Sequence, residues 1–138
     1  MKIVMDTDTV IALRSPGGAS AELIRRARRG EIQMAASVSL FMEYEAVCTR
    51  PEHALAAGLN RRQVGIFLEA LAHIVDPVEI HFLWRPQLRD PADELVLEAA
   101  VNAGADALLS FNLKHFAQAA SRFNLKLLQP GPFLRSLA

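Results

Sequence analysis

Cysteine is nearly absent from this chain, since Cys48 is the only one in 138 residues. No disulfide can form within the chain, and a metal site made of several thiolates is excluded, so a reducing compartment fits best. The sequence also has no apolar stretch of about 18 residues, the length that a membrane-spanning helix needs. Asp6 follows Met1 too closely for the apolar part of a secretory signal. We therefore expect a cytoplasmic protein with no membrane segment.

Net charge is absent as well, because fifteen lysines and arginines balance fifteen aspartates and glutamates. This balance argues against a protein that coats nucleic acid without specificity, and any affinity for nucleic acid must come from local patches or a bound metal ion. The arginines within residues 25–29 could hold RNA phosphates. They also fit the polar face of an amphipathic helix, which is the commoner role of such surface charge.

The chain has no internal repeat, no low-complexity segment and no linker rich in proline or glycine. Its 51% hydrophobic and 22% charged residues match the composition of a folded globular protein. A chain of this length suits one hydrophobic core. We predict a single domain over residues 1–138.

Short apolar runs alternate with helical patterns along the chain, which is typical of an α/β fold with a parallel sheet. The predicted strands are residues 3–5, 32–36, 78–82, 107–111 and 125–128. The predicted helices are residues 20–29, ended by Gly30; 39–49, capped by Ser39; 60–74, opened by a capping box of Asn60 and Gln63; and 90–103, opened by Asp90-Pro91 and ended by Gly104.

Polar side chains follow the ends of several predicted strands. Asp6 and Asp8 come after the first strand, and Asn112 comes after the fourth. Asp90 and Asp93 open a helix whose preceding loop leaves the third strand. Because ligands bind beyond the carboxyl ends of parallel strands, we expect these residues to share one edge of the sheet. Gathered carboxylates repel one another unless protons or cations neutralise them, and oxygen ligands select hard ions such as Mg²⁺ or Mn²⁺.

Four segments of the sequence resemble the successive motifs of PIN domains, in the same order and with similar spacing. They are residues 4–10, 39–45, 90–100 and 109–116. The resemblance covers essentially the whole chain and is closest to the toxin components of toxin–antitoxin systems related to VapC-like ribonucleases. It implies a three-layer α/β/α PIN-like fold with a central parallel sheet.

For function, the resemblance implies an endoribonuclease that hydrolyses single-stranded RNA with carboxylate-bound Mg²⁺ or Mn²⁺. The implied catalytic residues are Asp6, Glu43 and Asp93; the implied metal ligands are these three and Asp90; and the supporting residues are Asp8, Ser110 and Asn112. The implied partners are a cognate antitoxin and a second copy of the chain. For the dimer surface we expect apolar residues of two neighbouring helices, namely Val38, Leu40, Phe41, Leu59, Phe67 and Leu68.

The residues alone leave several of these roles open. Helical periodicity places Glu43 and Glu45 on opposite sides of an apolar stripe, and only the resemblance favours Glu43. Asp90 and Asp93 would stabilise the start of any helix, by roughly 0.5–1 kcal/mol each. Asn112 stands where many PIN domains have a fourth acid. Its amide oxygen brings no negative charge, so a second metal ion is expected to bind more weakly here.

Two other functions stay open at this point. Residues 6–9, Asp-Thr-Asp-Thr, also resemble the opening motif of haloacid-dehalogenase-like phosphatases, with Asp6 as the nucleophile. In that family an acidic pair comes after a serine or threonine, whereas here Asp90 and Asp93 come before Ser110, so the order is wrong. The second alternative is a non-catalytic PIN-fold module that binds RNA or protein with an incomplete acid cluster.

Overall fold

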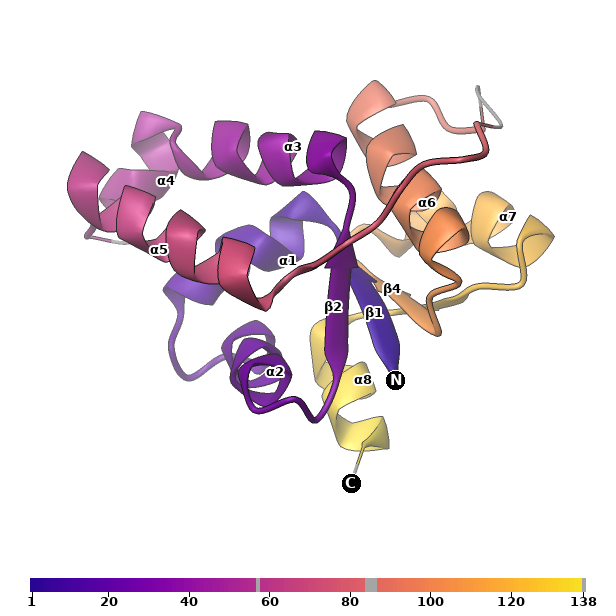
Figure 1. Ribbon diagram of the computed structural model, residues 1–138, viewed down its shortest axis with the longest axis horizontal. Coiled ribbons are helices and arrows are strands. Elements are labelled where there is room, and N and C mark those ends of the chain that lie inside the picture. Colours follow the sequence, from indigo (N-terminus) through magenta and orange to yellow (C-terminus); the bar gives the residue numbers. More distant parts are fainter. Residues whose placement is uncertain (57, 84–86, 138) are drawn as a thin grey trace.

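The computed structural model describes residues 1–56, 58–83 and 87–137. Five parallel strands form one sheet in the order β3-β2-β1-β4-β5. The strands are β1 (Lys2–Met5), β2 (Gln33–Ala36), β3 (Asp76–Pro77), β4 (Ala107–Leu109) and β5 (Lys126–Leu128). Figure 1 shows β1, the first strand of the chain, in the middle of the molecule.

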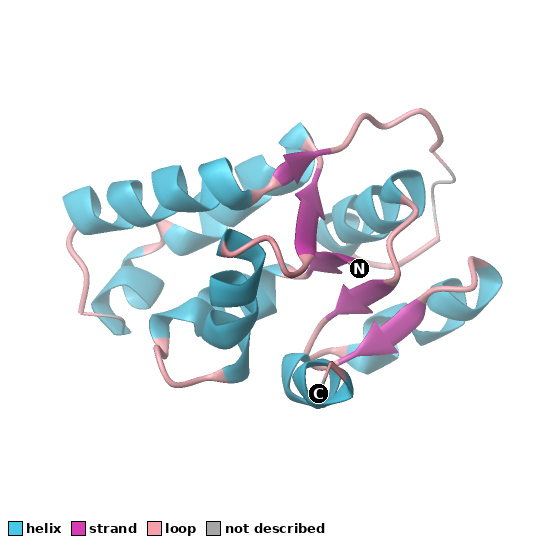
Figure 2. Cartoon of the chain, turned by 60° about the horizontal axis from the view of Figure 1, so that its bottom comes forward, coloured by secondary structure: helices cyan, strands magenta, loops and turns pink. Residues whose placement is uncertain are grey.

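The helices cover both faces of this sheet, as Figures 1 and 2 show. They are α1 (Thr7–Ile11), the 3₁₀ turn η1 (Ala12–Arg14), α2 (Ala19–Arg28), α3 (Val38–Cys48), α4 (Pro51–Ala56), α5 (Arg61–Ile74), α6 (Pro91–Ala103), α7 (Leu113–Arg122) and α8 (Pro130–Ser136). Helix α6 packs on β1, β2 and β4 with α7 beside it, while α2 packs on β2 with α8 beside it. The predicted three-layer α/β/α fold with a central parallel sheet is confirmed.

Two helix boundaries follow the predicted local chemistry. Asn60 and Gln63 form the capping box of α5, in which each side chain accepts a hydrogen bond from the backbone N–H of the other residue at 2.9 Å. Gly104 ends α6 in the left-handed conformation, with φ of 62°, where a side chain would be strained. At α3 the predicted cap was wrong. Ser37, not Ser39, caps this helix, because its Oγ accepts from the N–H of Leu40 at 3.1 Å.

The strand predicted over residues 78–82 was also wrong, since β3 covers only Asp76–Pro77. Pro77 has no N–H for a strand ladder. Beyond it, the side chain of Asn102 occupies the backbone groups that a neighbouring strand would need. Its Oδ1 accepts from the N–H groups of His81 and Phe82 at 2.9 and 3.0 Å, and its Nδ2 donates to the carbonyl of Phe82 at 3.0 Å. An amide side chain of α6 therefore replaces the ladder.

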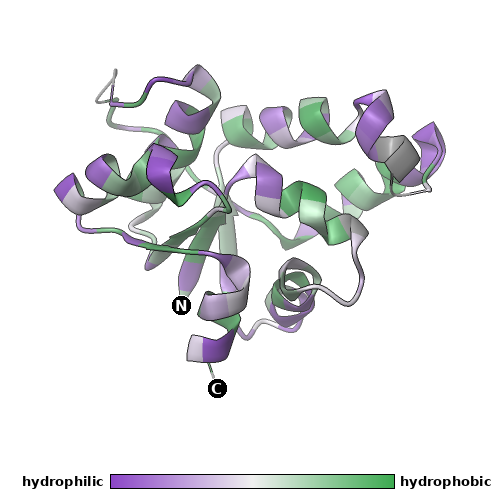
Figure 3. Cartoon of the chain, turned by 180° about the vertical axis from the view of Figure 1, so that it is seen from behind, coloured by the Kyte–Doolittle hydropathy of each residue, from purple (hydrophilic) through white to green (hydrophobic). Residues whose placement is uncertain are grey.

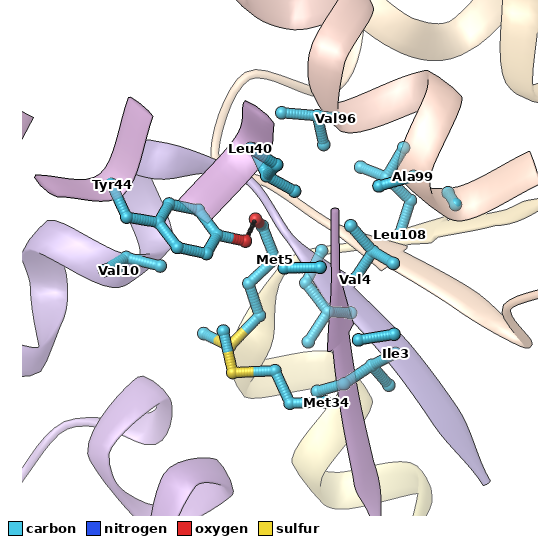
Figure 4. Close-up of a cluster of buried hydrophobic side chains, with 14 of the residues drawn as sticks. Ile3, Val4, Met5, Val10, Met34, Leu40, Tyr44, Val96, Ala99 and Leu108 are labelled. Carbon is cyan, nitrogen blue, oxygen red and sulfur yellow. Dashed lines mark hydrogen bonds between the residues drawn. The ribbon is translucent and has the colours of Figure 1, made fainter. Parts of the chain in front are cut away.

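The core surrounds β1, whose residues Ile3, Val4 and Met5 are at most 1% exposed. Figure 3 shows the hydrophobic strands inside and polar stretches on the outer helices. Tyr44 of α3 is fully buried and donates its hydroxyl hydrogen bond to the carbonyl of Met5, as drawn in Figure 4. This bond fixes α3 against the carboxyl end of β1, where Asp6 follows.

The predicted dimer surface needs a correction at this level. Leu40 and Leu68 lie in the core, so they are not available to a partner, and Phe41 is partly buried against this core. Val38 is 72% exposed.

Among the described residues, none of the helices has the length and apolarity that crossing a membrane requires.

Candidate functional site

Asp6 is the first residue after β1 and marks the centre of the carboxyl edge of the sheet. Its N–H continues the ladder by donating to the carbonyl of Leu109 at 2.8 Å. The side chain caps α1, because Oδ1 accepts from the N–H of Thr7 at 2.7 Å. Asp6 thus ends an apolar strand and begins a helix. This position leaves its carboxylate only 3% exposed at the edge of the sheet.

Ser110 connects this carboxylate to a second one. It follows β4, is fully buried, and its Oγ donates to Oδ2 of Asp6 at 2.7 Å. The same Oγ lies 3.5 Å from Oδ2 of Asp8. That oxygen of Asp8 also accepts from the N–H of Phe111 at 3.0 Å and from Nδ2 of Asn112 at 3.1 Å. The structure therefore brings four predicted site residues into one hydrogen-bond network at the edge of β1 and β4.

Asp93 reaches the same edge from the first turn of α6. Its Oδ2 lies 3.2 Å from Nδ1 of His115, a residue of the first turn of α7. Burial raises the pKa of Asp93, and the charges of Asp6 and then Asp90 raise it further, while His115 opposes the rise. Asp90 itself is exposed and caps α6, with Oδ1 accepting from the N–H of Ala92 at 2.9 Å. The capping role predicted for Asp90 is therefore present.

Glu43 stands apart from this network. It is half-buried on α3 and, among the described residues, has no hydrogen bond or ion pair with the other acids. Glu45 lines an apolar groove with Ala72 of α5 and with Val75, the residue that follows α5. Because residues two apart lie about 200° around a helix, Glu43 is on the side away from α5. Its role as a metal ligand stays a prediction.

The carboxylate and amide oxygens at this edge are suitable ligands for a hard divalent cation, although the acids do not surround a single point. Within the described parts of the chain, no three His, Cys, Asp or Glu side chains are close enough to hold one ion. Burial, followed by the charge of Asp6, raises the pKa of Asp8 to about 6. Oδ1 of Asp8 is buried without a hydrogen-bond partner in the described residues. Neighbouring carboxylates with an orphaned oxygen are what a cation such as Mg²⁺ would stabilise.

A cleft adjoins the acids on the side of α7. Its volume is about 380 Å³, and it is lined by residues 87–90 and Asp93 on one wall and by Lys114, His115 and Gln118 on the other. Asp93 and His115 contact each other and both line this cleft, so the cleft reaches one of the predicted catalytic acids.

His115 was not predicted as a site residue, because the four histidines show no spacing typical of metal ligands. The available signal was its position, five residues after Ser110 at the start of the helix that follows β4. The first turn of such a helix lies at the carboxyl edge of a parallel sheet.

The four arginines at the end of α2 lie elsewhere, and three of them have ion-pair partners. Arg25, Arg26 and Arg29 lie 3.0–3.6 Å from Glu22, and Arg29 also lies 3.0 Å from Glu31. They occupy the end of α2 that leads into β2, which is the amino edge of the sheet. This network supports the interpretation of a solvated helix face.

Comparison with known proteins decides the family. Residues 2–114 match the family model described as PIN domain. The chain belongs to the PIN-domain family. This PIN domain is also similar to a solved structure, that of VapBC2 from Rickettsia felis bound to a DNA fragment from their promoter, with a TM-score of 0.62 and 13% sequence identity. The similarity covers 92% of this chain and 97% of that chain, and at this identity it shows the fold alone. None of the curated proteins matches the sequence.

Proposed function

We propose that this PIN domain is an endoribonuclease that hydrolyses single-stranded RNA with Mg²⁺ or Mn²⁺ and serves as the toxin of a toxin–antitoxin pair. PIN domains are typically nucleases and typically use Mg²⁺. The observation that carries the proposal is the buried network in which Ser110 joins Asp6 to Asp8, with Asp93 close enough for its pKa to respond to the charge of Asp6.

Asp6 and Asp93 are the proposed metal ligands at the centre of the site, with Glu43 and Asp90 completing the set and with Asp6, Glu43 and Asp93 as the catalytic residues. When bound, a divalent cation would lower the pKa of a water molecule and neutralise charge on the phosphodiester. The chain itself holds the ligands in place. Both oxygens of Asp6 accept hydrogen bonds, one from Thr7 and one from Ser110, so that this carboxylate has one fixed orientation.

Asn112 supports the site in a different way from an acid. Its side-chain amide donates to Asp8 at 3.1 Å, and its backbone N–H donates to Oγ of Ser110 at 2.9 Å. An acid at this position would add a charge to carboxylates that already repel one another. The amide instead favours the ionised form of Asp8. One metal ion is therefore the better proposal for this chain than two.

For partners, we propose a cognate antitoxin and a homodimer. The solved relative is named as a VapBC2 complex, which supports a protein partner of the antitoxin kind. An arginine or lysine of that partner would pair with Asp6 or Asp93 and displace the metal ion. For the homodimer, a groove of about 260 Å³ between α3 and α5 offers apolar surface, including Val38 and Met42, which are 72% and 62% exposed. Sedimentation as a strict monomer at high concentration would count against the dimer.

Asn112 also favours the second candidate, a non-catalytic module that binds RNA or protein. In such a module the hydrogen bond from the side-chain amide of Asn112 would stabilise the carboxylate of Asp8, so that no metal ion is needed to neutralise it. Phosphatase chemistry with Asp6 as the nucleophile is disfavoured, because its acidic pair should follow the serine or threonine, whereas Asp90 and Asp93 precede Ser110.

The test combines metal binding with cleavage of single-stranded RNA. Wild type should bind Mn²⁺ and cut RNA, and Asp6→Asn and Glu43→Gln should lose both properties. Glu45→Gln is the matched control for Glu43, because it removes the exposed glutamate two residues along the same helix. Wild type that binds no Mn²⁺ would favour the non-catalytic module. Loss of cleavage in Glu45→Gln with retention in Glu43→Gln would overturn the assignment of Glu43.

A further inference from the structure

The cleft between residues 87–90 and α7 is lined by side chains of both charges. Its lining includes two acids, Asp90 and Asp93, and two cations, Arg89 and Lys114. Arg89 and Lys114 are exposed and, among the described residues, neither has an ion-pair partner. By contrast, Arg25, Arg26 and Arg29 at the end of α2 each lie within 3.6 Å of Glu22. The cations of the cleft are therefore available to an anion.

The wall that carries Arg89 is held in place by buried contacts. Glu94 is 5% exposed, and its Oε1 accepts from the N–H groups of Gln87 and Leu88 at 2.5 and 2.7 Å. From the opposite wall, Arg122 donates to the carbonyl of Gln87 at 3.5 Å. A buried carboxylate that satisfies two consecutive amides fixes the backbone just before Arg89. The position of this wall of the cleft is therefore determined by hydrogen bonds to its backbone.

The wall formed by α7 presents a row of polar side chains. Lys114, Gln118 and Arg122 are spaced four residues apart, so they lie on one face of the helix, and the apolar residues Phe116 and Ala120 are buried on the other. Lys114 and Gln118 of this row line the cleft, and the row begins beside His115, which contacts Asp93. A chain of phosphates lying along the row would reach the acids at its end.

We propose that this cleft binds the phosphate backbone of the single-stranded RNA substrate, with Arg89 and Lys114 as the phosphate ligands on its two walls; this rests on the nuclease function proposed above. Lysine and arginine are the side chains that bind phosphates, and their contribution is electrostatic. A volume of about 380 Å³ lies in the range of about 300–1,000 Å³ that holds a small organic ligand. This is enough room for one nucleotide unit of a flexible strand.

The experiment measures binding without cleavage, by fluorescence anisotropy of a labelled ten-nucleotide single-stranded RNA in chelator at several salt concentrations. The test variants are Arg89→Gln and Lys114→Gln. The controls are Arg62→Gln on α5 and Lys126→Gln on β5, which remove the same charges from other surfaces. All four positions are exposed, and equal midpoints of thermal unfolding would show that the variants fold.

Each test variant should weaken binding by about threefold to tenfold at low salt and reduce the slope of log K against log salt by about 0.7, as expected for one lost phosphate contact to a single strand. The controls should bind like wild type, and a duplex of the same sequence should bind more weakly. Absence of RNA binding by wild type, or equal losses in the test and control variants, would overturn the proposal.

Parallel cleavage assays with Mg²⁺ separate this proposal from the nuclease function. If wild type binds RNA through Arg89 and Lys114 but does not cut it, the cleft is supported and the nuclease function fails. If wild type cuts RNA while both test variants bind and cut like the controls, the nuclease function is supported and the cleft is wrong.

Discussion

Replacing Asp8 by asparagine should stabilise the fold at neutral pH in the absence of a divalent cation. Burial, and next the charge of Asp6, raise the pKa of Asp8 from its ordinary value of 3.8 to about 6. Hydrogen bonds from Phe111, Thr9 and Ser110 only partly oppose this rise. The ionised carboxylate is therefore less favourable in the folded chain than in the unfolded chain.

The magnitude follows from the pKa of Asp8. A rise from 3.8 to about 6 corresponds to about 3 kcal/mol at pH values well above 6. Since Asp8 is only partly buried, solvent screening reduces this to roughly 1 kcal/mol. Below pH 3.8 both states are protonated and the penalty is absent; it grows as the pH rises toward 6 and is complete above that value. Asparagine keeps an oxygen that can accept from the N–H of Phe111.

Urea unfolding of wild type and Asp8→Asn in chelator measures this difference. At pH of about 7.5 the variant should be more stable by roughly 1 kcal/mol, and the difference should disappear near pH 4. Mg²⁺ should then stabilise wild type more than the variant. Glu45→Gln, which removes an exposed acid, should show neither effect. A variant that is less stable than wild type at pH 7.5, or a difference that does not change with pH, would refute the reasoning.

Three further changes test separate parts of the account. Asp6→Asn should abolish Mg²⁺- or Mn²⁺-dependent cleavage of single-stranded RNA, while its unfolding free energy stays equal to wild type or rises slightly, because one repelling charge is removed. Tyr44→Phe should lower the unfolding free energy by about 1–2 kcal/mol, because the buried carbonyl of Met5 loses its partner; calorimetry measures this, and an unchanged midpoint would contradict it. Glu94→Ala should lower it by about 2 kcal/mol and increase hydrogen exchange at Gln87 and Leu88, and unchanged exchange there would count against the role of Glu94.

The placement of Asp6, Ser110 and Asn112 at one edge of the sheet could be predicted, because it depends on sheet topology more than on side-chain detail. Once the apolar runs were recognised as parallel strands, Asp6 and Asn112 had to lie at the same edge. The capping box of Asn60 and the stop at Gly104 could be predicted for a similar reason. Each depends on a few neighbouring residues and on local backbone chemistry.

Other features depend on contacts between distant residues and could not be predicted from local pattern. The missing strand at residues 78–82 results from hydrogen bonds to Asn102, a residue of a later helix. Ser37 and Ser39 are equally good caps in sequence, and tertiary packing chooses between them. Glu43 lies at the edge of an apolar stripe, where periodicity gives no side preference. The place of His115 beside Asp93 required the position of α7 against α6.

The most direct test of the central claim is the chemistry of the cut ends. Single-stranded RNA should be cut in the presence of Mg²⁺ or Mn²⁺ to give 5′-phosphate and 3′-hydroxyl ends, because water and not the 2′-hydroxyl of the RNA attacks the phosphodiester. A substrate with 2′-O-methyl at the cut site should therefore still be cleaved. Cyclic 2′,3′-phosphate ends, or undiminished cutting by Asp6→Asn in chelator, would contradict the account and show that the carboxylates of this PIN domain do not perform the reaction.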